Sequence, residues 1–293
     1  MFTDAHTHLN ISPLYEDRPT HIQEFITKHG VWLSIIWTDY ENSVKALEIV
    51  RQSSIQSPQL QLGATVWLHP ECVLHHVQQG KERDQRLQES IDQIEQLIQD
   101  HPTSLVAVGE IGTDLHREQY RPYHDQQQEL FDAQCALARR YNLPVVIHSR
   151  ADFDGTVQVL QNYQDLTIYF HCRWYTCEEI TKLTEFLPDT FVCNGNGYIW
   201  FCGNTTYPKA HDLRSSLSLC HELGIPILIE TDAPFLAAQA VRGQTNSPAL
   251  ISHTYEYISD YLQLPLDQLT SMIANNRGKL YSKVISSSTL PAW

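Results

Sequence analysis

The first ten residues read MFTDAHTHLN and place Asp4, His6 and His8 at alternate positions. Side chains two residues apart in a β-strand point to the same face, so these three groups could converge. Two imidazoles on one side of a strand end suit a metal ion better than an apolar core. The alternative interpretation is a polar N-terminus with two unrelated histidines, because short metal motifs often match by chance.

Eight short apolar runs, rich in Val, Ile and Leu, indicate the elements that would carry such groups. Each run is bounded by turn signals, which is typical of strands buried on both faces. The expected strands cover residues 2–5, 31–37, 62–68, 105–108, 144–147, 166–170, 190–193 and 226–229.

Helical patterns alternate with these runs. The clearest covers residues 84–100, where apolar side chains recur on one face and His101-Pro102 follows. Similar patterns cover residues 126–141, 153–163, 176–186, 209–223, 255–261 and 266–274. This alternation predicts an α/β fold, a single (β/α)8 TIM barrel over residues 1–293. A doubly wound open sheet is the competing architecture, but no Gly-rich fingerprint follows the first strand.

Seven ionisable residues fall at the carboxyl ends of the expected strands, namely His6, His8, His69, Glu110, His148, His171 and Asp232. In a barrel these ends share one rim, on which active sites are built. All but His69 are plausible metal ligands, although each alone could be a satisfied buried polar group. Together they predict a metal site at the C-terminal rim of the strands.

Longer motifs around these residues carry a family resemblance. They are DAHTHL at 4–9, the His69-Pro70 pair, GEIGTD at 109–114, LPVVIHSR at 143–150, FHC at 170–172 and ETDAPFL at 230–236, followed by RGQTNSPAL at 242–250 and NNRGKLY at 275–281. With these motifs in this order, the chain resembles, nearly end to end, the TatD-type metal-dependent hydrolases, many of which act as DNases.

The resemblance implies a site for two divalent metal ions. One ion would be held by His6, His8 and Asp232, the other by His148 and His171, and Glu110 would bridge both. This mixture of imidazole and carboxylate suits Zn²⁺ or Mn²⁺, and Mg²⁺ is the third candidate because family members are often tested with it. Two such ions can activate a shared water for attack on a phosphodiester. Asp232 and Glu110 are then the predicted catalytic residues, with Asp232 orienting or deprotonating that water.

Further residues are candidates for binding the substrate or supporting the site. His69 could donate to a phosphate, or it could cap the His-Pro turn. Asp114 could orient a ligand histidine, or it could simply belong to a turn. Arg150, Arg173 and Trp174 are the expected substrate contacts, because arginine binds phosphate and aromatic faces stack on unpaired bases.

Other rim groups carry two interpretations each. Arg117, Arg121 and Arg242 fall in loops after expected strands, where they could bind phosphate or pair with nearby carboxylates. Tyr198 and Trp200 are expected in the loop after the seventh strand, where they could stack on bases or pack the loop onto the barrel.

Composition narrows the class of protein. The 293-residue chain has a net charge of −14, which argues against a basic surface that wraps duplex DNA but not against an enzyme that acts on one strand end. We expect no membrane association, because no apolar run reaches membrane length and no signal peptide is evident. Seven scattered cysteines without a CxxC pair favour a cytoplasmic location.

The predicted function is therefore a metal-dependent hydrolase, a DNase similar to a 3′–5′ exonuclease that acts on single-stranded or frayed DNA ends. One alternative is a hydrolase of a carboxylic ester or amide, such as an aminoacyl-tRNA deacylase. Another is a metal-binding scaffold within a larger assembly. The chain departs from the family pattern at residues 172–175, where CRWY replaces a Phe-Ser-Gly-like stretch. This departure puts the usual substrate in doubt, and a specialised role in a bacterial defence system is a further hypothesis.

Overall fold

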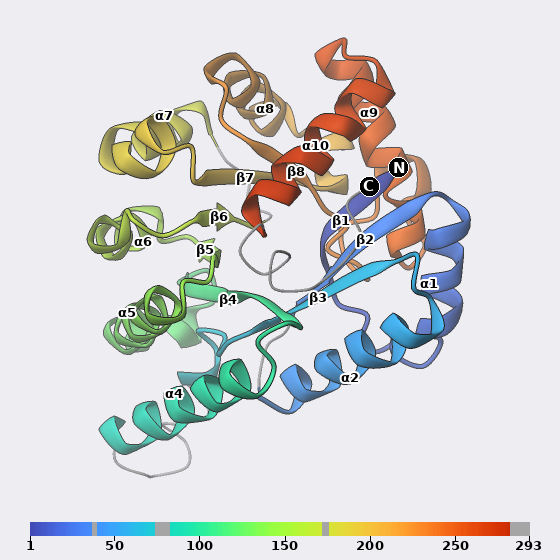
Figure 1. The fold of residues 1–293 in the computed structure, drawn as a ribbon. Helices are drawn as coiled ribbons and strands as arrows, with labels where there is room; N and C mark the ends of the chain where they lie inside the picture. Colours follow the sequence, from blue (N-terminus) through green and yellow to red (C-terminus); the bar gives the residue numbers. More distant parts are fainter. Residues whose placement is uncertain (37–39, 74–82, 172–175, 282–293) are drawn as a thin grey trace.

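The computed structural model describes residues 1–36, 40–73, 83–171 and 176–281. Within these residues, eight parallel strands follow one another in chain order around one sheet, as Figure 1 shows. The strands are β1 (Phe2–Thr7), β2 (Gly30–Ile35), β3 (Gln61–Val66), β4 (Leu105–Asp114), β5 (Val145–Arg150), β6 (Ile168–Phe170), β7 (Gly197–Phe201) and β8 (Ile227–Ile229). The predicted (β/α)8 barrel is confirmed.

The first and last strands meet through the segment that follows β8. Thr7, at the end of β1, forms a parallel bridge with Ala233. The amide of Asp232 donates to the carbonyl of His6 at 3.0 Å, and the amide of His8 donates to the carbonyl of Ala233 at 2.8 Å. These bonds close the sheet at its carboxyl rim, beside the residues that the sequence singles out for chemistry.

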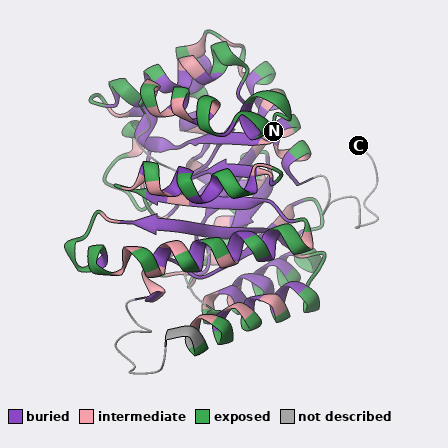
Figure 2. Ribbon diagram, turned by 90° about the vertical axis from the view of Figure 1, so that its left-hand side faces the viewer, coloured by how far each residue is buried: buried purple, intermediate pink, exposed green. Residues whose placement is uncertain are grey.

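Helices cover the outside of the barrel, with their buried faces toward the strands and their exposed faces toward solvent (Figure 2). They are α1 (Arg18–Thr27), α2 (Tyr40–Gln56), α4 (Arg83–Asp100), α5 (His124–Tyr141), α6 (Phe153–Leu160), α7 (Cys177–Phe186), α8 (His211–Leu223), α9 (Ser252–Leu262) and α10 (Leu266–Leu280). The sequence did not predict α1 and α2, because polar residues interrupt their apolar stripes. Among the helices described, none is long and apolar enough to cross a membrane.

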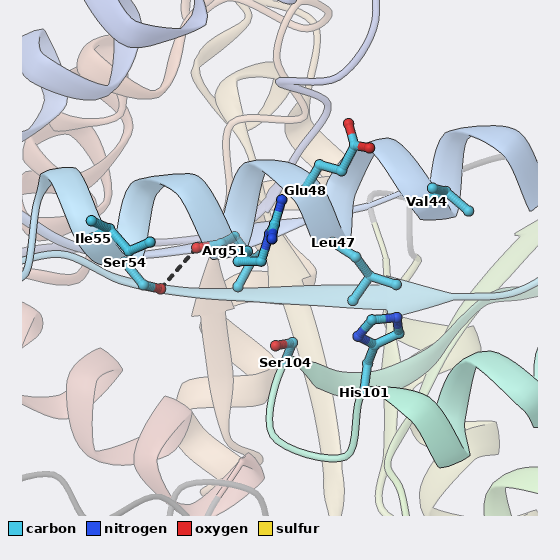
Figure 3. Close-up of a pocket in the computed structure, with 9 residues that line it drawn as sticks. Val44, Leu47, Glu48, Arg51, Ser54, Ile55, His101 and Ser104 are labelled. Atoms are coloured by element: carbon cyan, nitrogen blue, oxygen red, sulfur yellow. Dashed lines mark hydrogen bonds between the residues drawn. The ribbon is translucent and has the colours of Figure 1, made fainter.

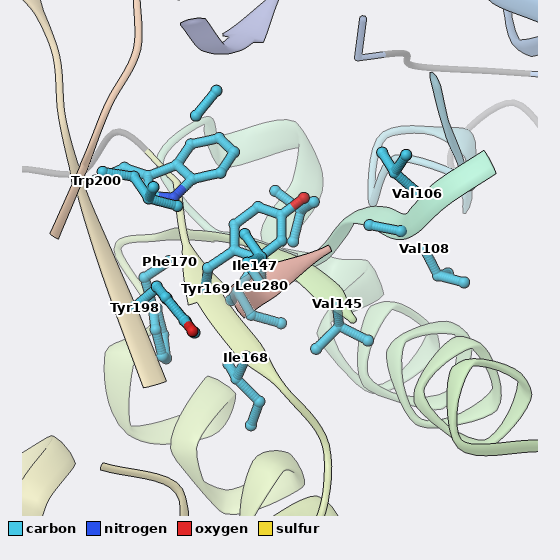
Figure 4. Packing of buried hydrophobic residues seen from close by; sticks show 14 of the residues in the cluster. Val106, Val108, Val145, Ile147, Ile168, Tyr169, Phe170, Tyr198, Trp200 and Leu280 are labelled. Atoms are coloured by element: carbon cyan, nitrogen blue, oxygen red, sulfur yellow. The ribbon is translucent and has the colours of Figure 1, made fainter. Parts of the chain in front are cut away.

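Aromatic rings stack inside the barrel, and aliphatic side chains of the neighbouring strands are buried beside them (Figure 4). Tyr169 on β6 and Trp200 on β7 stack with their ring centroids 4.3 Å apart. Tyr281, at the end of α10, stacks on Trp32 of β2 at 5.3 Å and donates to the Tyr169 hydroxyl at 3.3 Å. Full burial of one large apolar side chain contributes about 1.5–3 kcal/mol to stability. The barrel therefore has a well-packed floor beneath its rim.

The expected strand at residues 190–193 is wrong. Asp189–Cys193 forms a short helical turn, and the seventh strand is Gly197–Phe201. Both segments are short apolar runs, so local sequence does not separate them. Tertiary packing does, because the Phe191 ring lies directly against Gly197, where a Cβ atom would be only 2.4 Å from it. Phe191 thus packs onto β7 instead of forming it.

Alanine at Gly197 tests this packing. The added methyl group overlaps the Phe191 ring, so we expect the free energy of unfolding to fall by about 1–3 kcal/mol in a denaturant titration. Gly278→Ala is the matched control, because a Cβ there meets nothing within 4 Å. Gly278 lies inside α10, so its replacement should raise stability by about 0.5–1 kcal/mol. The same effect from both variants would contradict the proposed contact.

Candidate metal centre

The end of β1 directs two histidines to the rim while Asp4 turns away from them. His6 and His8 are both buried, and their Nε2 atoms lie 3.2 Å apart. Asp4 instead accepts hydrogen bonds from the Thr231 amide at 2.9 Å and the Thr231 hydroxyl at 2.6 Å. Burial raises the pKa of Asp4 to about 8 despite these bonds. The expectation that all three side chains converge is therefore correct for the two histidines and wrong for Asp4.

Two glycines let β4 approach β5 closely enough to present Glu110. The pairing of these strands shifts register between Val108 and Ile111, the interval that contains Gly109 and Glu110. A Cβ at Gly112 would lie 2.0 Å from the carbonyl oxygen of His148, and Gly112 has a φ of +138°. Only glycine fits this close approach, so the GEIG sequence explains how a carboxylate inside a strand reaches the rim.

Glu110 lies at the centre of the cluster, and its two oxygens face different histidines. Oε1 is 2.8 Å from Nε2 of His6 and 3.8 Å from Nε2 of His171. Oε2 is 3.3 Å from Nδ1 of His148. A carboxylate that reaches separate groups with each oxygen has the arrangement that bridging requires, and the bridging role itself stays a prediction.

Asp232 lies beside His6 and His8 in the cluster. Its Oδ1 lies 3.3 Å from Nε2 of His8 and 3.6 Å from Nε2 of His6. The backbone of Asp232 has a φ of +53°, in the left-handed region that non-glycine residues rarely adopt. The barrel closure described above holds it there. His6, His8 and Asp232 form one group of side chains that could hold a metal ion.

Three histidines are anchored through one ring nitrogen and present the other to the cluster. Nδ1 of His8 is 3.1 Å from the carbonyl of Ile36, Nδ1 of His171 is 3.0 Å from Glu230, and Nε2 of His148 is 3.3 Å from Asp114. If a metal ion is bound, the proton would stay on each outer nitrogen and the lone pair of the inner nitrogen would face the ion. Ligand histidines in proteins are oriented in this way, so the residues present fit a divalent metal centre.

The electrostatics of the cluster also favour a cation. Burial and the neighbouring His171 lower the pKa of His6 to about 3, so His6 is neutral at pH 7. Burial opposes ionisation of Glu110, but His171 and the hydrogen bonds of His148 and His6 hold its pKa well below the usual range. Burial opposes protonation of His8, His148 and His171, but the facing carboxylates raise the pKa of each of them. The buried carboxylates therefore favour positive charge beside them, and a divalent ion would supply it in place of these protons.

Sequence reasoning missed Glu230. Its side chain is fully buried, 3.0 Å from Nδ1 of His171 and 3.8 Å from Nδ1 of His6. Burial raises its pKa to about 7, although His171 opposes this shift. The sequence does carry a pattern that could have indicated this residue. Glu230 and Asp232 are separated by one residue at the end of a strand, as are His6 and His8.

His69 fits both interpretations that its sequence position allows. Its Nδ1 accepts a hydrogen bond from the amide of Glu71 at 3.1 Å, which caps the His-Pro turn. Burial and His148 lower the pKa of His69 to about 3, so the ring is neutral at pH 7. The remaining nitrogen, Nε2, then carries the proton and can donate to a ligand. The His69 ring lies 4.8 Å from the ring of His148, at the edge of the cluster.

Of the residues predicted to support the site or bind the substrate, some lie beside the cluster and others do not. Asp114 is buried against His148, as an orienting role requires. Burial opposes ionisation of Asp114, but the hydrogen bond and charge of His148 hold its pKa below the usual range. Arg150, the last residue of β5, is exposed and adds a smaller lowering of the same pKa. Arg173 and Trp174 lie outside the described residues. The roles of all four stay predictions.

The other rim arginines and aromatic residues have local partners or lie elsewhere. Arg117 contacts Glu71 at 3.5 Å, and Arg121 donates to the carbonyl of Leu115 at 3.1 Å. Tyr198 and Trp200 belong to β7 and are buried, so the expectation that they lie in a rim loop is wrong. Trp200 instead lies edge-on to His6 at 5.7 Å, beneath the cluster.

A separate pocket lies outside this cluster, between α2 and the turn before β4 (Figure 3). Figure 3 shows Leu47 and Arg51 of α2 near His101 and Ser104. Ser104 directly precedes β4, so this pocket borders the amino-terminal end of that strand. Its place in the fold separates it from the candidate metal centre.

A parallel eight-stranded barrel with histidines and carboxylates clustered at its carboxyl rim defines the class of metal-dependent hydrolases built on TIM barrels. The histidines and carboxylates of the strand-end motifs DAHTHL, GEIGTD, LPVVIHSR, FHC and ETDAPFL fall at that rim. The chain belongs to the TatD family, because the family model described as TatD related DNase matches residues 3–282. The predicted resemblance is confirmed.

Similar proteins extend over nearly the whole chain. An uncharacterized metal-dependent hydrolase of Mycoplasma pneumoniae is 29% identical over 284 residues, which cover 96% of this chain and 99% of the relative. The crystal structure of YjjV, a TatD homologue of Escherichia coli, has a TM-score of 0.77 and 25% identity, and the match covers 96% of this chain and 98% of that one. A Pantoea ananatis protein named 3′-5′ ssDNA/RNA exonuclease TatD is 28% identical over 189 residues, covering 61% of this chain and 67% of the relative.

Glutamine at Glu230 tests how His171 is oriented. The variant keeps the shape of the side chain but removes the anionic partner of the imidazole, so we expect Zn²⁺ affinity to fall about 10–100-fold. Competition with a chromogenic chelator measures this affinity. Glu222→Gln, an exposed change on α8, is the control and should leave it unaltered. Equal affinities for both variants would show that Glu230 does not support the metal centre.

Proposed function

We propose that this protein hydrolyses phosphodiesters with two divalent metal ions and acts as a DNase on single-stranded or frayed ends, in the 3′–5′ direction. The observation that carries the proposal is the cluster around Glu110, whose two oxygens face His6 and His148 separately. His6, His8 and Asp232 would hold one ion, His148 and His171 the other, and Glu110 both. The ions are Zn²⁺, Mn²⁺ or Mg²⁺, with the nitrogen-rich donor set favouring the first two.

Divalent ions held there would lower the pKa of a water molecule and neutralise charge on the scissile phosphate. Burial opposes ionisation of Asp232, but the hydrogen bond to His8 and the neighbouring His171 hold its pKa below the usual range. Asp232 is therefore an anion at neutral pH, and we assign it the acceptance of the nucleophile's proton. His69 donates from Nε2 to a phosphate oxygen, and Arg150 supplies positive charge at the mouth.

The direction and substrate are supported by one relative, the Pantoea ananatis protein whose name describes a 3′-5′ exonuclease on single-stranded DNA and RNA. A cytoplasmic location is part of the proposal. It is supported by the cysteines, because no disulfide joins those within the described part of the chain. We further propose that residues 1–293 act as one domain.

Purified protein incubated with end-labelled DNA strands and Mg²⁺, Mn²⁺ or Zn²⁺ tests this function. We expect stepwise shortening of single strands from the 3′ end and slower shortening of blunt duplexes, resolved on a denaturing gel. A parallel assay with aryl esters and aminoacyl-tRNA separates phosphodiester from carboxylic ester hydrolysis. Metal-loaded protein that hydrolyses an ester substrate but leaves every strand intact would overturn the proposal.

The Glu110→Gln variant addresses the bridging carboxylate. Loss of the anionic charge between the two groups of histidines should lower the metal content from two ions to one or none and reduce turnover at least about 100-fold. The far-ultraviolet circular dichroism spectrum should be unchanged, because the rim is separate from the packed floor of the barrel. Elemental analysis measures the metal content. A stoichiometry equal to that of the original protein would contradict the assignment.

A further inference from the structure

A phenylalanine stands exposed beside the candidate metal centre. Phe235 follows Asp232 by three residues, and 52% of its surface is accessible to solvent. Its ring centroid lies 5.9 Å from that of His8, with the planes inclined by 71°. Single exposed apolar side chains are common on protein surfaces, but this phenyl ring stands beside the cluster, where a bound ligand would cover it.

The backbone of Phe235 is held on both sides. Its amide donates to the carbonyl of Asp232 at 2.8 Å, and its carbonyl accepts from the side-chain amide of Asn246 at 2.6 Å. The same Asn246 group also donates to the carbonyl of Thr231 at 2.9 Å. The phenyl ring and the Asp232 carboxylate are thus mounted on one short segment with shared hydrogen bonds.

The residues after Phe235 are also packed firmly, against the turn Gly203–Thr206 that follows β7. The amide of Gln239 donates to the Thr206 hydroxyl at 2.7 Å, and the Tyr207 hydroxyl donates to the carbonyl of Ala237 at 3.1 Å. A Cβ on Gly203 would lie 2.1 Å from the carbonyl oxygen of Leu236, so the two segments touch through their backbones. This segment cannot fold inward to bury the phenyl ring without breaking these contacts.

We propose that Phe235 is the platform on which the unpaired base of the reacting nucleotide stacks. This inference rests on the proposed function and names the substrate class as nucleotides in a single strand, not phosphate esters in general. The phosphate and base of one nucleotide are separated by one sugar, so a phosphate at the metal centre brings its base to the adjoining rim. A rigid aromatic face stacks on any base and loses little conformational entropy in doing so.

The platform also explains a preference for free ends. Within a duplex both faces of a base are already covered by its neighbours, so Phe235 can cover a base only after it unpairs. A terminal or frayed nucleotide meets this condition at low cost. The phenyl ring therefore selects the same substrates that the proposed exonuclease activity requires.

Kinetics with two matched DNA strands test the platform. One strand is normal, and the other lacks only the base of its terminal nucleotide. We expect Phe235→Ala to lower kcat/KM about 10-fold on the normal strand, as loss of one stacked base predicts, and to leave hydrolysis of the abasic strand unchanged. Phe235→Trp should restore the normal strand. Phe186→Ala, an exposed phenylalanine of α7 away from the rim, is the control and should alter neither.

An equal loss on both strands would mean that Phe235 only supports the site, and it would overturn the platform, as would no loss on the normal strand. Failure of the proposed function looks different, because the unaltered protein with bound metal would then cleave neither strand. In that case the affinity for a labelled single strand, measured by fluorescence anisotropy, tests the platform. Unaltered protein and Phe235→Ala binding this strand equally would refute the platform, and weaker binding by the variant that Phe235→Trp reverses would support it.

Discussion

The joint between β1 and the segment after β8 is the contact on which the rest of the molecule depends. Asp4 holds Thr231 through both carboxylate oxygens, while the backbone of His6 and His8 holds Asp232 and Ala233. All of these groups are buried, so water does not compete for their hydrogen bonds. The joint closes the sheet and, with the same bonds, sets Asp232 beside the two histidines. Barrel closure and assembly of the candidate site are one event.

The buried polar cluster at the rim lowers the free energy of unfolding, and the apolar packing below it offsets this loss. The cluster contains three buried carboxylates, those of Glu110, Glu230 and Asp232. Burial disfavours the ionised form of each of them. The apolar floor formed by Tyr169 and Trp200 stabilises the barrel without contributing polar groups to the cluster. Trp200 belongs to both layers, because its edge contacts with His6 and His171 separate the cluster from the interior.

Much of the fold and the site could be predicted because barrels place chemistry at strand ends. A histidine directly after an apolar run was enough to find His148 and His171, and the alternation at the start of the chain was enough for His6 and His8. The failures have separate causes. Asp4 turns away because its partner Thr231 lies 227 positions later. The seventh strand was misplaced because two short apolar runs follow one another there, and the packing of Phe191 on Gly197 decides which of them forms the strand. Glu230 was overlooked beside the more prominent Asp232.

The separation of the site residues along the chain has a consequence for the order of synthesis. His6 emerges early from the ribosome, and Asp232 emerges only after seven further strands have been made. No nascent polypeptide that stops short of Asp232 contains the joint or the completed cluster. A protein with the proposed activity would therefore be unable to cleave nucleic acid during most of its own translation. It would acquire its active centre only when the last strand of the barrel has been made.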